Sequence, residues 1–341
     1  MKILVTEVED WEKQSFQQFM EHHEVIFTDE PLNKDLADKY SDVEVICPFI
    51  YSSLQAQDLE PFSELKLIAT RSTGFDHIDS DYCSEHDITV CNVPSYGKNT
   101  VVEHVFGLLL TISHNLREAL DRTRRGDFSM SGLQGFDLRN KTLGVIGTGD
   151  IGQCVIAIAK GFGMRVLAFD VNPDQDAAEQ AGFSYVGLEE LLENSDIVTV
   201  HVPANKQTRH MISTEQFSRM REGAILINTS RGAIVDVDAL LQALTEGRLR
   251  AAGLDVLPEE PTIREEAELV RTLYQEEHDQ RTLLVDHVLL RLNNVYITPH
   301  SAFNTREAVQ RILDTSVDNM TGFMAGSPQN VVVNHSRQTS S

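Results

Sequence analysis

Short apolar runs alternate with helical patterns along almost the whole chain, and this alternation constrains the fold more than any other feature. In the first hundred residues the runs cover residues 3–5, 24–27, 43–47, 65–70 and 88–93. Short buried strands separated by helices are typical of parallel sheets with βα crossovers. The sequence therefore predicts an α/β protein.

A second series of apolar runs begins at Thr142. Its six members cover residues 142–147, 166–170, 196–203, 223–228, 251–256 and 295–298. Six strands with intervening helices make a complete doubly wound sheet. At 341 residues the chain is long enough for two such domains.

The end of the chain is too short for a third domain. After residue 300 it offers one helix and a short run, Val331-Val332-Val333, so we expect it to return to the first domain. This predicts residues 1–99 and 300–333 as one domain, with 100–299 inserted as the other. Residues 334–341 are polar and predict a flexible tail.

One helical segment is apolar on nearly every side. Thr100-Val101-Val102-Glu103 has the pattern of a capping box, and the helix it would open runs to about residue 115. Such a helix must be buried between domains or subunits. We therefore expect a symmetric homodimer built through the inserted domains.

The charged segment 262–291 could be a lid or a solvated excursion.

Composition excludes several classes of partner. The formal net charge of -23 makes nucleic acid and anionic membranes poor partners, because their phosphates would be repelled. No apolar stretch has the length of a membrane span, and the N-terminal residues lack a secretory pattern. Lysine is scarce, with only nine residues in the chain. An acidic surface poor in lysine suits either a salt-adapted protein or a moderately acidic bacterial enzyme.

The four cysteines lack the spacing of metal ligands or of a disulfide framework. Cys47, Cys83, Cys91 and Cys154 are scattered, so they are expected to be small core residues in a reducing compartment. This favours a cytoplasmic protein. No metal site is expected: turn capping is the better interpretation of Asp76, His77 and Asp79.

A glycine-rich turn follows the first strand of the second series. Gly147, Gly149 and Gly152 suit a tight turn, a close approach of pyrophosphate and tight packing of helix on strand, with Asp150 and Ile151 between them. Asp170 ends the next strand and could accept hydrogen bonds from ribose hydroxyls. A 2'-phosphate would meet this carboxylate, so NAD is favoured over NADP.

Three polar groups end apolar runs and complement one another. His300 could transfer a proton, and the carboxylate of Glu260 could orient its imidazole and stabilise the protonated form. Arg231 could bind the carboxylate of a substrate. Together they indicate hydride transfer to or from a small acid. Glu259 competes with Glu260 by proximity.

Four ordered motifs resemble those of the D-isomer-specific 2-hydroxyacid dehydrogenases. They are the glycine turn at 147–152, NTSRG at 228–232, LDVLPEEP at 254–261 and ITPHSAF at 297–303. The resemblance covers roughly residues 1–333. RSTGFDHID at 71–79, followed by NVPSYGKNTVVEH at 92–104, is similar to the D-lactate dehydrogenase branch.

The resemblance implies a Rossmann NAD-binding domain inserted into a flavodoxin-like substrate domain. It implies that Arg231 binds the substrate, that His300 paired with Glu260 transfers the proton, and that Asp255 holds the nicotinamide carboxamide. The backbone of Thr73 and Gly74 would complete the carboxylate site. Tyr51, Tyr96 and Phe303 would wall the pocket, with Phe49 possible, and His201, Val202, Pro203, Thr229 and Ser230 would join the cofactor site.

The expected reaction interconverts a 2-keto acid and a D-2-hydroxy acid, most simply pyruvate and D-lactate. Hydroxypyruvate, glyoxylate or phenylpyruvate are alternative keto acids. A non-enzymatic NAD-sensing module is a further alternative. The D-lactate branch often has Ala-Tyr-Ser-Pro where this chain has Ser95-Tyr96-Gly97-Lys98, which leaves the detail of substrate selection open.

Overall fold

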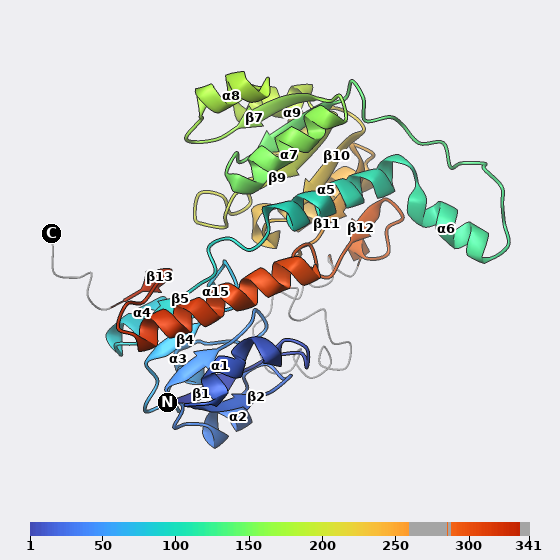
Figure 1. Cartoon of the computed structure of the whole chain (residues 1–341). Coiled ribbons are helices and arrows are strands. Elements are labelled where there is room, and N and C mark those ends of the chain that lie inside the picture. Colours follow the sequence, from blue (N-terminus) through green and yellow to red (C-terminus); the bar gives the residue numbers. More distant parts are fainter. Residues whose placement is uncertain (259–284, 286–287, 335–341) are drawn as a thin grey trace. The chain divides into compact units, whose positions relative to one another are not determined.

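The computed structural model describes residues 1–258, 285 and 288–334 (Figure 1). Contacts divide it into a discontinuous unit, Met1–Gly97 with Asn304–Ser341, and an inserted unit, Lys98–Phe303. The boundaries predicted from the sequence fall after residues 99 and 299. Most of the charged segment 262–291 and almost all of the tail 334–341 lie outside the described residues.

The discontinuous unit has a six-stranded sheet in the order β13-β5-β4-β3-β1-β2. Its strands are β1 Lys2–Val5, β2 Glu24–Phe27, β3 Val45–Cys47, β4 Leu67–Ala69, β5 Thr89–Cys91 and β13 Val331–Val333. Its α-helices are α1 Gln17–Met20, α2 Lys34–Lys39, α3 Ala56–Leu59, α4 Ser80–Glu85 and α15 Arg306–Met324. All pairs are parallel except β13 with β5, so the end of the chain closes one edge of this sheet.

The inserted unit has a seven-stranded parallel sheet in the order β12-β11-β10-β9-β6-β7-β8. Its strands are β6 Thr142–Ile146, β7 Arg165–Phe169, β8 Ser184–Tyr185, β9 Ile197–Val200, β10 Ala224–Asn228, β11 Leu249–Leu254 and β12 Val295–Ile297. Its helices include α5 Lys98–Ser113, α6 Leu116–Arg124, α7 Asp150–Gly161, α8 Gln175–Ala181, α9 Leu188–Asn194, α10 Thr214–Arg219 and α11 Val237–Thr245. The prediction of two parallel-sheet domains is confirmed.

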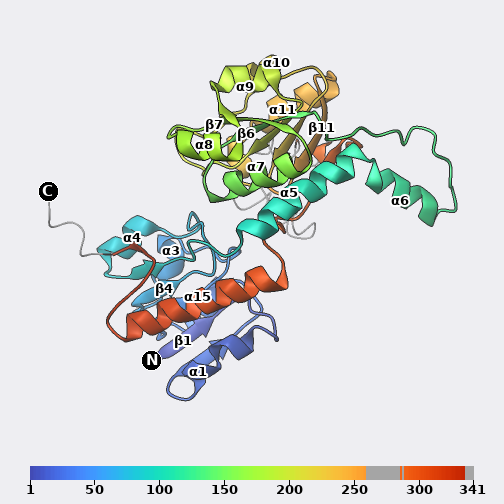
Figure 2. The same ribbon diagram turned by 45° about the horizontal axis from the view of Figure 1, so that its top comes forward.

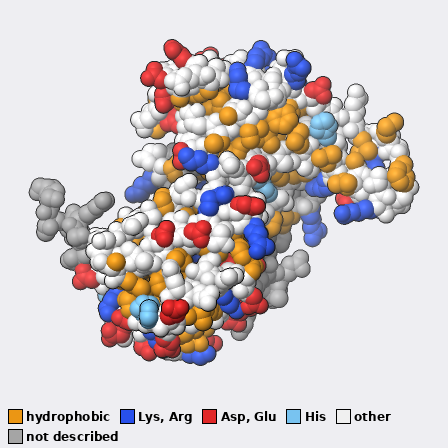
Figure 3. Space-filling view, in the orientation of Figure 1, with side chains coloured by type: hydrophobic (Ala, Val, Ile, Leu, Met, Phe, Trp, Pro, Cys, Tyr) orange, Lys and Arg blue, Asp and Glu red, His pale blue; other side chains and the backbone are white. Residues whose placement is uncertain are grey.

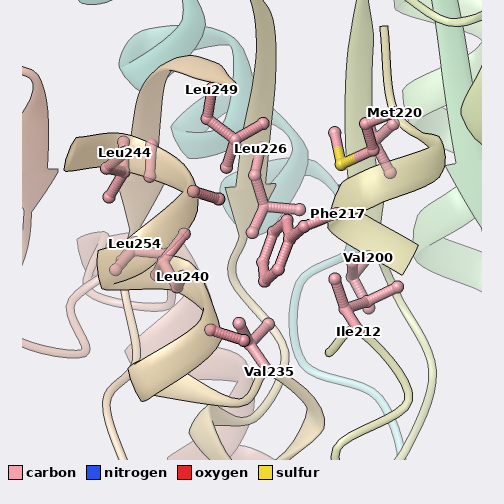
Figure 4. Packing of buried hydrophobic residues seen from close by; sticks show 14 of the residues in the cluster. Val200, Ile212, Phe217, Met220, Leu226, Val235, Leu240, Leu244, Leu249 and Leu254 are labelled. Carbon is pink, nitrogen blue, oxygen red and sulfur yellow. The ribbon is translucent and has the colours of Figure 1, made fainter. Parts of the chain in front are cut away.

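Both faces of the inserted sheet are buried, which explains why its strands read as continuous apolar runs. Successive side chains of a strand point to opposite faces. Leu226 of β10 accordingly joins the core cluster that contains Phe217 and Leu240, whereas its neighbours Ile225 and Ile227 join the cluster on the other face. Figure 4 shows the first of these clusters, with the ring of Phe217 among aliphatic side chains.

The sequence prediction was wrong about the start of α5. The helix begins at Lys98, so Thr100 lies in its first turn and is not a cap. The Thr100 hydroxyl instead donates a hydrogen bond to the carbonyl of Ala302, 2.9 Å away. A tertiary partner has therefore replaced the local one that the capping-box pattern predicts.

The apolar surface of α5 is covered within its own unit. Val101, Val105, Leu109 and Ile112 are buried, and the helix packs against α7, β10 and β11 (Figure 2). The apolar character of α5 therefore does not require a second subunit, and this helix gives no support for a dimer.

One strand of the inserted sheet was not predicted. β8 contains two residues, Ser184–Tyr185, and pairs with β7 at the edge of the sheet. Two residues without an apolar run carry no periodic signal. The expected six strands are therefore seven.

Three of the four cysteines are small core residues, as predicted, whereas Cys154 is only partly buried. All four are free, and Cys47, Cys83 and Cys91 are buried. Burial raises the pKa of the thiols of Cys47 and Cys83 to about 12 and that of Cys91 to about 11. Within the described part of the chain, no helix combines the length and apolar character needed to cross a membrane.

Candidate functional site

Three of the predicted site residues lie at the carboxyl ends of three neighbouring strands. Arg231 follows β10, Asp255 follows β11 and His300 follows β12. The strands pair in parallel in that order, so their carboxyl ends share one edge of the inserted sheet. This edge is where ligands bind in open α/β sheets.

A buried asparagine shapes the turn that carries Arg231. The Asn228 side-chain carbonyl accepts hydrogen bonds from the Ser230 backbone N–H and hydroxyl, at 3.1 and 3.0 Å. Its amide donates to the Arg231 carbonyl at 3.0 Å. Because Asn228 is 1% exposed, the direction in which Arg231 leaves the sheet is set by the end of β10.

The next residue of this turn packs against the segment that leads towards Glu260. A Cβ atom added at Gly232 would lie 2.2 Å from the carbonyl carbon of Leu257, so only glycine fits. Glu260 and its rival Glu259 themselves lie outside the described residues. Their pairing with His300 remains a prediction.

Asp255 is a buried carboxylate that organises the turn around His300. The backbone N–H groups of Ser301 and Ala302 donate to its two oxygens, each at 2.9 Å. The Thr298 hydroxyl donates to it as well, and Nε2 of His104 lies 3.4 Å away. Asp255 therefore holds the chain on both sides of His300.

These hydrogen bonds also determine the charge of Asp255. Burial alone would raise its pKa, but hydrogen bonds from His104, Thr298, Ala302 and Ser301 outweigh burial and lower the pKa below its ordinary value. The carboxylate thus remains charged at neutral pH although it is 1% exposed.

His300 has a backbone conformation that L-residues rarely adopt. Its φ is 51°, and its N–H donates to the Thr298 carbonyl at 2.9 Å. Such left-handed residues persist where the surroundings over-determine them, and they gather at functional sites. Here the surroundings are the hydrogen bonds that Asp255 accepts.

The sequence reasoning missed two residues of this group, His104 and Thr298. Nε2 of His104 shares a hydrogen bond of 2.9 Å with the Thr298 hydroxyl, so α5 contacts the turn through a polar side chain. The available signal was a histidine in a helix that is largely apolar. Its partner, however, lies 194 residues further along the chain.

The glycine-rich turn joins β6 to α7 as predicted from its spacing. Gly147 has a φ of 92°, and a Cβ atom at Gly152 would lie 2.1 Å from the Gly147 carbonyl oxygen. Gly149 caps α7, and a Cβ there would meet nothing within 4 Å. The backbone is therefore open to a ligand at the N-terminus of α7, beside Ile151 and the exposed Asp150, which pairs with Lys98 at 2.8 Å.

Asp170 lies at the end of β7, beside this turn. One of its oxygens accepts from the Thr148 N–H at 2.7 Å, and the other accepts from the Asn172 N–H at 2.9 Å. Burial would raise the pKa of Asp170, but the hydrogen bonds from Thr148, Asn172 and Val171 outweigh it and lower the pKa. A charged acceptor thus stands next to the glycine turn.

Other predicted cofactor residues follow β9 and β10. His201, Val202 and Pro203 directly succeed β9, and a Cβ at Gly147 would lie 2.7 Å from the His201 carbonyl oxygen. Thr229 follows β10, and its buried hydroxyl has no hydrogen-bond partner among the described residues. An unpartnered buried hydroxyl is the kind of group that a ligand completes.

The discontinuous unit presents its predicted residues at the carboxyl edge of its own sheet. Tyr51 follows β3, Thr73 and Gly74 follow β4, and Tyr96 follows β5. Asn92 donates to the Thr73 carbonyl at 2.7 Å, and Arg311 of α15 donates to the Tyr96 carbonyl. Phe303 is the last residue of the inserted unit.

Of the residues weighed as metal ligands, Asp79 is a helix cap. Its carboxylate accepts from the Tyr82 N–H at 2.9 Å at the start of α4, as predicted. In the part of the chain that the structure describes, no group of three or more potential metal ligands is present.

The chain is similar to known proteins over most of its length. Residues 106–302 match the family model of the D-isomer specific 2-hydroxyacid dehydrogenase NAD binding domain. D-lactate dehydrogenase of Escherichia coli is 35% identical over 96% of this chain and 98% of its own length. Glycerate dehydrogenase of Methylorubrum extorquens is 39% identical over 82% of each chain. The crystal structure of D-lactate dehydrogenase from Aquifex aeolicus, complexed with NAD and lactic acid, superposes with a TM-score of 0.85 at 36% identity, covering 97% of this chain and 99% of that one.

His201 should make the protein sensitive to acid. Burial lowers the pKa of its imidazole from 6.5 to about 4, although part of the residue reaches the surface. Between these pH values the unfolded chain binds a proton that the native state does not. Stability present above pH 6.5 is therefore lost as the pH falls towards 4, by up to about 3 kcal/mol.

The His201→Gln variant should lose this part of the acid sensitivity in urea unfolding measured at stepped pH values. His210→Gln is the matched control in the same unit, because the side chain of His210 is 46% exposed. An unchanged pH dependence in His201→Gln would contradict the assignment.

Proposed function

The chain belongs to the D-isomer-specific 2-hydroxyacid dehydrogenases, and we propose that it reduces pyruvate to D-lactate. As a member of this family it is an NAD-dependent oxidoreductase that interconverts a 2-keto acid and a D-2-hydroxy acid. The observation that supports the proposed site most directly is the placement of Arg231, Asp255 and His300 on three adjacent strand ends. Relatives named for D-lactate and for pyruvate cover nearly the whole chain, which favours pyruvate as the substrate.

In this proposal Arg231 binds the substrate carboxylate and carbonyl oxygen. Its planar guanidinium can donate two parallel hydrogen bonds, which lysine could not reproduce. Nη1 of Arg231 donates to the Ser230 carbonyl at 2.8 Å, which helps to orient the side chain. By resemblance to the family, backbone N–H groups of Thr73 and Gly74 complete the carboxylate site.

His300 supplies the proton in this proposal. Its imidazole donates a proton to the carbonyl oxygen as hydride arrives at the carbon, and it accepts that proton in the reverse reaction. Glu260 would stabilise the imidazolium, as the family motif implies. Asp255 holds the backbone on both sides of His300, so the ring is positioned before the substrate binds.

The described residues fit NAD. Gly149 leaves the N-terminus of α7 open to a pyrophosphate, Asp170 offers a charged acceptor for ribose hydroxyls, and the hydroxyl of Thr229 is buried with no partner in the described chain. The bound cofactor supplies or takes the hydride. His201, Val202, Pro203 and Ser230 belong to the same proposed site.

The third substituent of the keto acid decides which substrate is preferred. By resemblance to the family it faces Tyr51, Tyr96 and Phe303, whose bulk leaves more room for a methyl group than for a ring. Each methylene in such a pocket changes discrimination by only about 1 to 3 kcal/mol, so other keto acids should also react. Hydroxypyruvate is the second candidate, because the glycerate dehydrogenase relative is 39% identical.

The homodimer remains part of the proposal, now supported by a different surface. Leu116, Leu120, Phe128 and Met130 are 42%, 58%, 80% and 85% exposed. They lie on α6 and on the segment after it, which together extend away from the rest of the inserted unit in Figures 1 and 2. Figure 3 shows hydrophobic atoms gathered on this projecting arm. A second copy of the inserted unit would bury them.

We also place the enzyme in the cytoplasm. The support is chemical: all four cysteines are free, which suits a reducing compartment. Among them, Cys47, Cys83 and Cys91 are core residues.

The wild-type protein should convert pyruvate and NADH to D-lactate, identified by chiral chromatography of the product. His300→Ala should lower kcat by about 10²- to 10⁴-fold, because the proton donor is lost. NADH binding, followed by fluorescence, should stay nearly unchanged. His114→Ala, at an exposed histidine of the same unit, should retain full activity.

Two results would count against this function, and a third would count against the proposed pocket alone. L-lactate as the product would contradict the stereochemistry. A His300→Ala enzyme with near wild-type turnover would contradict the mechanism. A tenfold preference for phenylpyruvate or hydroxypyruvate over pyruvate would contradict only the proposed pocket.

Asp170 should determine the choice between NAD and NADP. Replacing Asp170 by Ala and the neighbouring Val171 by Arg should lower kcat/KM with NADH and raise it with NADPH, because a carboxylate repels a 2'-phosphate that arginine attracts. The side chain of Val171 is 82% exposed, so an arginine fits there. Asp174→Asn, which keeps the N-cap of α8, should leave the ratio unchanged. Equal wild-type efficiency with both cofactors would contradict the role of Asp170.

Light scattering should give a mass near twice 38.2 kDa for the wild-type protein. Phe128→Asp combined with Met130→Asp should shift the mass to that of one chain, because two charges would be buried without partners in the interface. Met20→Asp, at a residue 56% exposed in the discontinuous unit, should leave the dimer intact. A monomeric wild-type protein at micromolar concentration would refute the proposal.

A further inference from the structure

A single carboxylate holds the loop that carries Tyr51. Oε2 of Glu7 accepts from the Phe49 N–H at 2.8 Å and from the Ser52 hydroxyl at 2.6 Å, and Oε1 accepts from the Tyr51 N–H at 2.7 Å. The loop lies more than forty residues from Glu7 in the sequence. Hydrogen bonds from backbone N–H groups to a carboxylate are charge-assisted and stronger than those between neutral groups.

Glu7 is itself held in an unusual conformation. It follows β1 with a φ of 53°, which non-glycine residues rarely adopt. Its N–H donates to the Glu30 carbonyl at 3.2 Å, and its own carbonyl accepts from Nη2 of Arg71 at 2.8 Å. The backbone of Glu7 is thereby fixed by hydrogen bonds on both sides, which anchors the side chain that binds the loop.

Arg71 anchors this arrangement from inside the unit. It is 2% exposed, and its Nη1 pairs with Oε2 of Glu12 at 3.0 Å. Nη2 also donates to the Thr6 carbonyl, so three acceptors compensate the buried cation. The guanidinium carbon lies 5.5 Å from the centre of the Phe49 ring. Arg71 thus supports both Glu7 and the loop that Glu7 binds.

We propose that Glu7 is a positioning residue that sets keto-acid selectivity by fixing Tyr51. This inference rests on the proposed function, in which Tyr51 faces the third substituent of the substrate. Tyr51 is 48% exposed, and its ring lies edge-on to that of Phe49, with 5.7 Å between the ring centres. The hydrogen bonds that Phe49, Tyr51 and Ser52 donate to Glu7 hold the backbone on both sides of Tyr51, so the position of the phenol depends on this carboxylate.

Glu7→Gln tests this with almost no change in shape. The amide keeps one oxygen, but its NH₂ group must face either the Tyr51 N–H or the Phe49 N–H. Two donors then point at each other, and one loop N–H loses its partner. The variant should therefore loosen the loop while retaining β1, the Arg71 contacts to the backbone and the buried ion pair.

We expect the KM for pyruvate to rise about tenfold in Glu7→Gln, the size expected when one hydrogen bond to a charged acceptor is lost. The kcat should stay within about twofold, since His300 is untouched. The KM for phenylpyruvate should rise less than the KM for pyruvate. The ratio of kcat/KM for phenylpyruvate to that for pyruvate should therefore rise several-fold. The NADH dissociation constant should not change. A role in stability alone would lower the melting temperature without moving this ratio.

Two further variants separate the possible causes. Asp79→Asn removes one carboxylate from the same unit but keeps the cap of α4, because asparagine caps as well as aspartate. It should leave the ratio unchanged, which excludes an effect of net charge. Tyr51→Leu removes the phenol itself and should move the ratio in the same direction as Glu7→Gln.

An unchanged ratio in Glu7→Gln together with a shifted ratio in Tyr51→Leu would overturn the inference and leave the proposed function standing. If Tyr51→Leu also left the ratio unchanged, the pocket assignment would fail together with the inference. Should Glu7→Gln not fold, Glu7→Asp decides by the same ratio, because it keeps the charge but shortens the side chain by one methylene and withdraws the carboxylate from the N–H groups of Phe49 and Tyr51. A wild-type ratio in folded Glu7→Asp would then refute the inference.

Discussion

Parallel pairing is the constraint on which both units depend, because it brings the carboxyl ends of neighbouring strands to one edge of a sheet. In the inserted unit, three adjacent strands deliver Arg231, Asp255 and His300 to that edge. In the discontinuous unit, the ends of β1 and β3 deliver Glu7 and Tyr51. Each of these proposed site residues and Glu7 thus follows the end of a parallel strand.

Both units use the same physical device to stiffen such a loop. Asp255 accepts from the backbone of Ser301 and Ala302, and Glu7 accepts from the backbone of Phe49 and Tyr51. Asp255 is 1% exposed, and a buried carboxylate is costly unless it is hydrogen-bonded, so breaking its loop would also leave a charge uncompensated. Moving this loop therefore costs more free energy than the loss of its hydrogen bonds alone.

The fold and the glycine-rich turn could be predicted because their sequence signals are local. Apolar runs such as 223–228 and the spacing of Gly147 to Gly152 are visible in short windows of sequence. What the sequence could not reveal depends on partners far along the chain. Thr100 resembles a cap but donates to Ala302, the two residues of β8 are ordered by β7, and Glu7 binds a loop more than forty residues away. Long-range hydrogen bonds produce no periodic pattern in the amino-acid sequence.

The divided architecture has a consequence for how the enzyme is made. β13 pairs with β5, and α15 packs against β4, yet roughly two hundred residues of the inserted unit are translated between these partners. While a ribosome synthesises the inserted unit, the first sheet has no strand on its β5 edge and no cover from α15. An open sheet edge is prone to pair with other chains. The N-terminal sheet therefore stays incomplete until the inserted unit and the last helix and strand have been translated, and its exposed apolar surface is open to aggregation for that time.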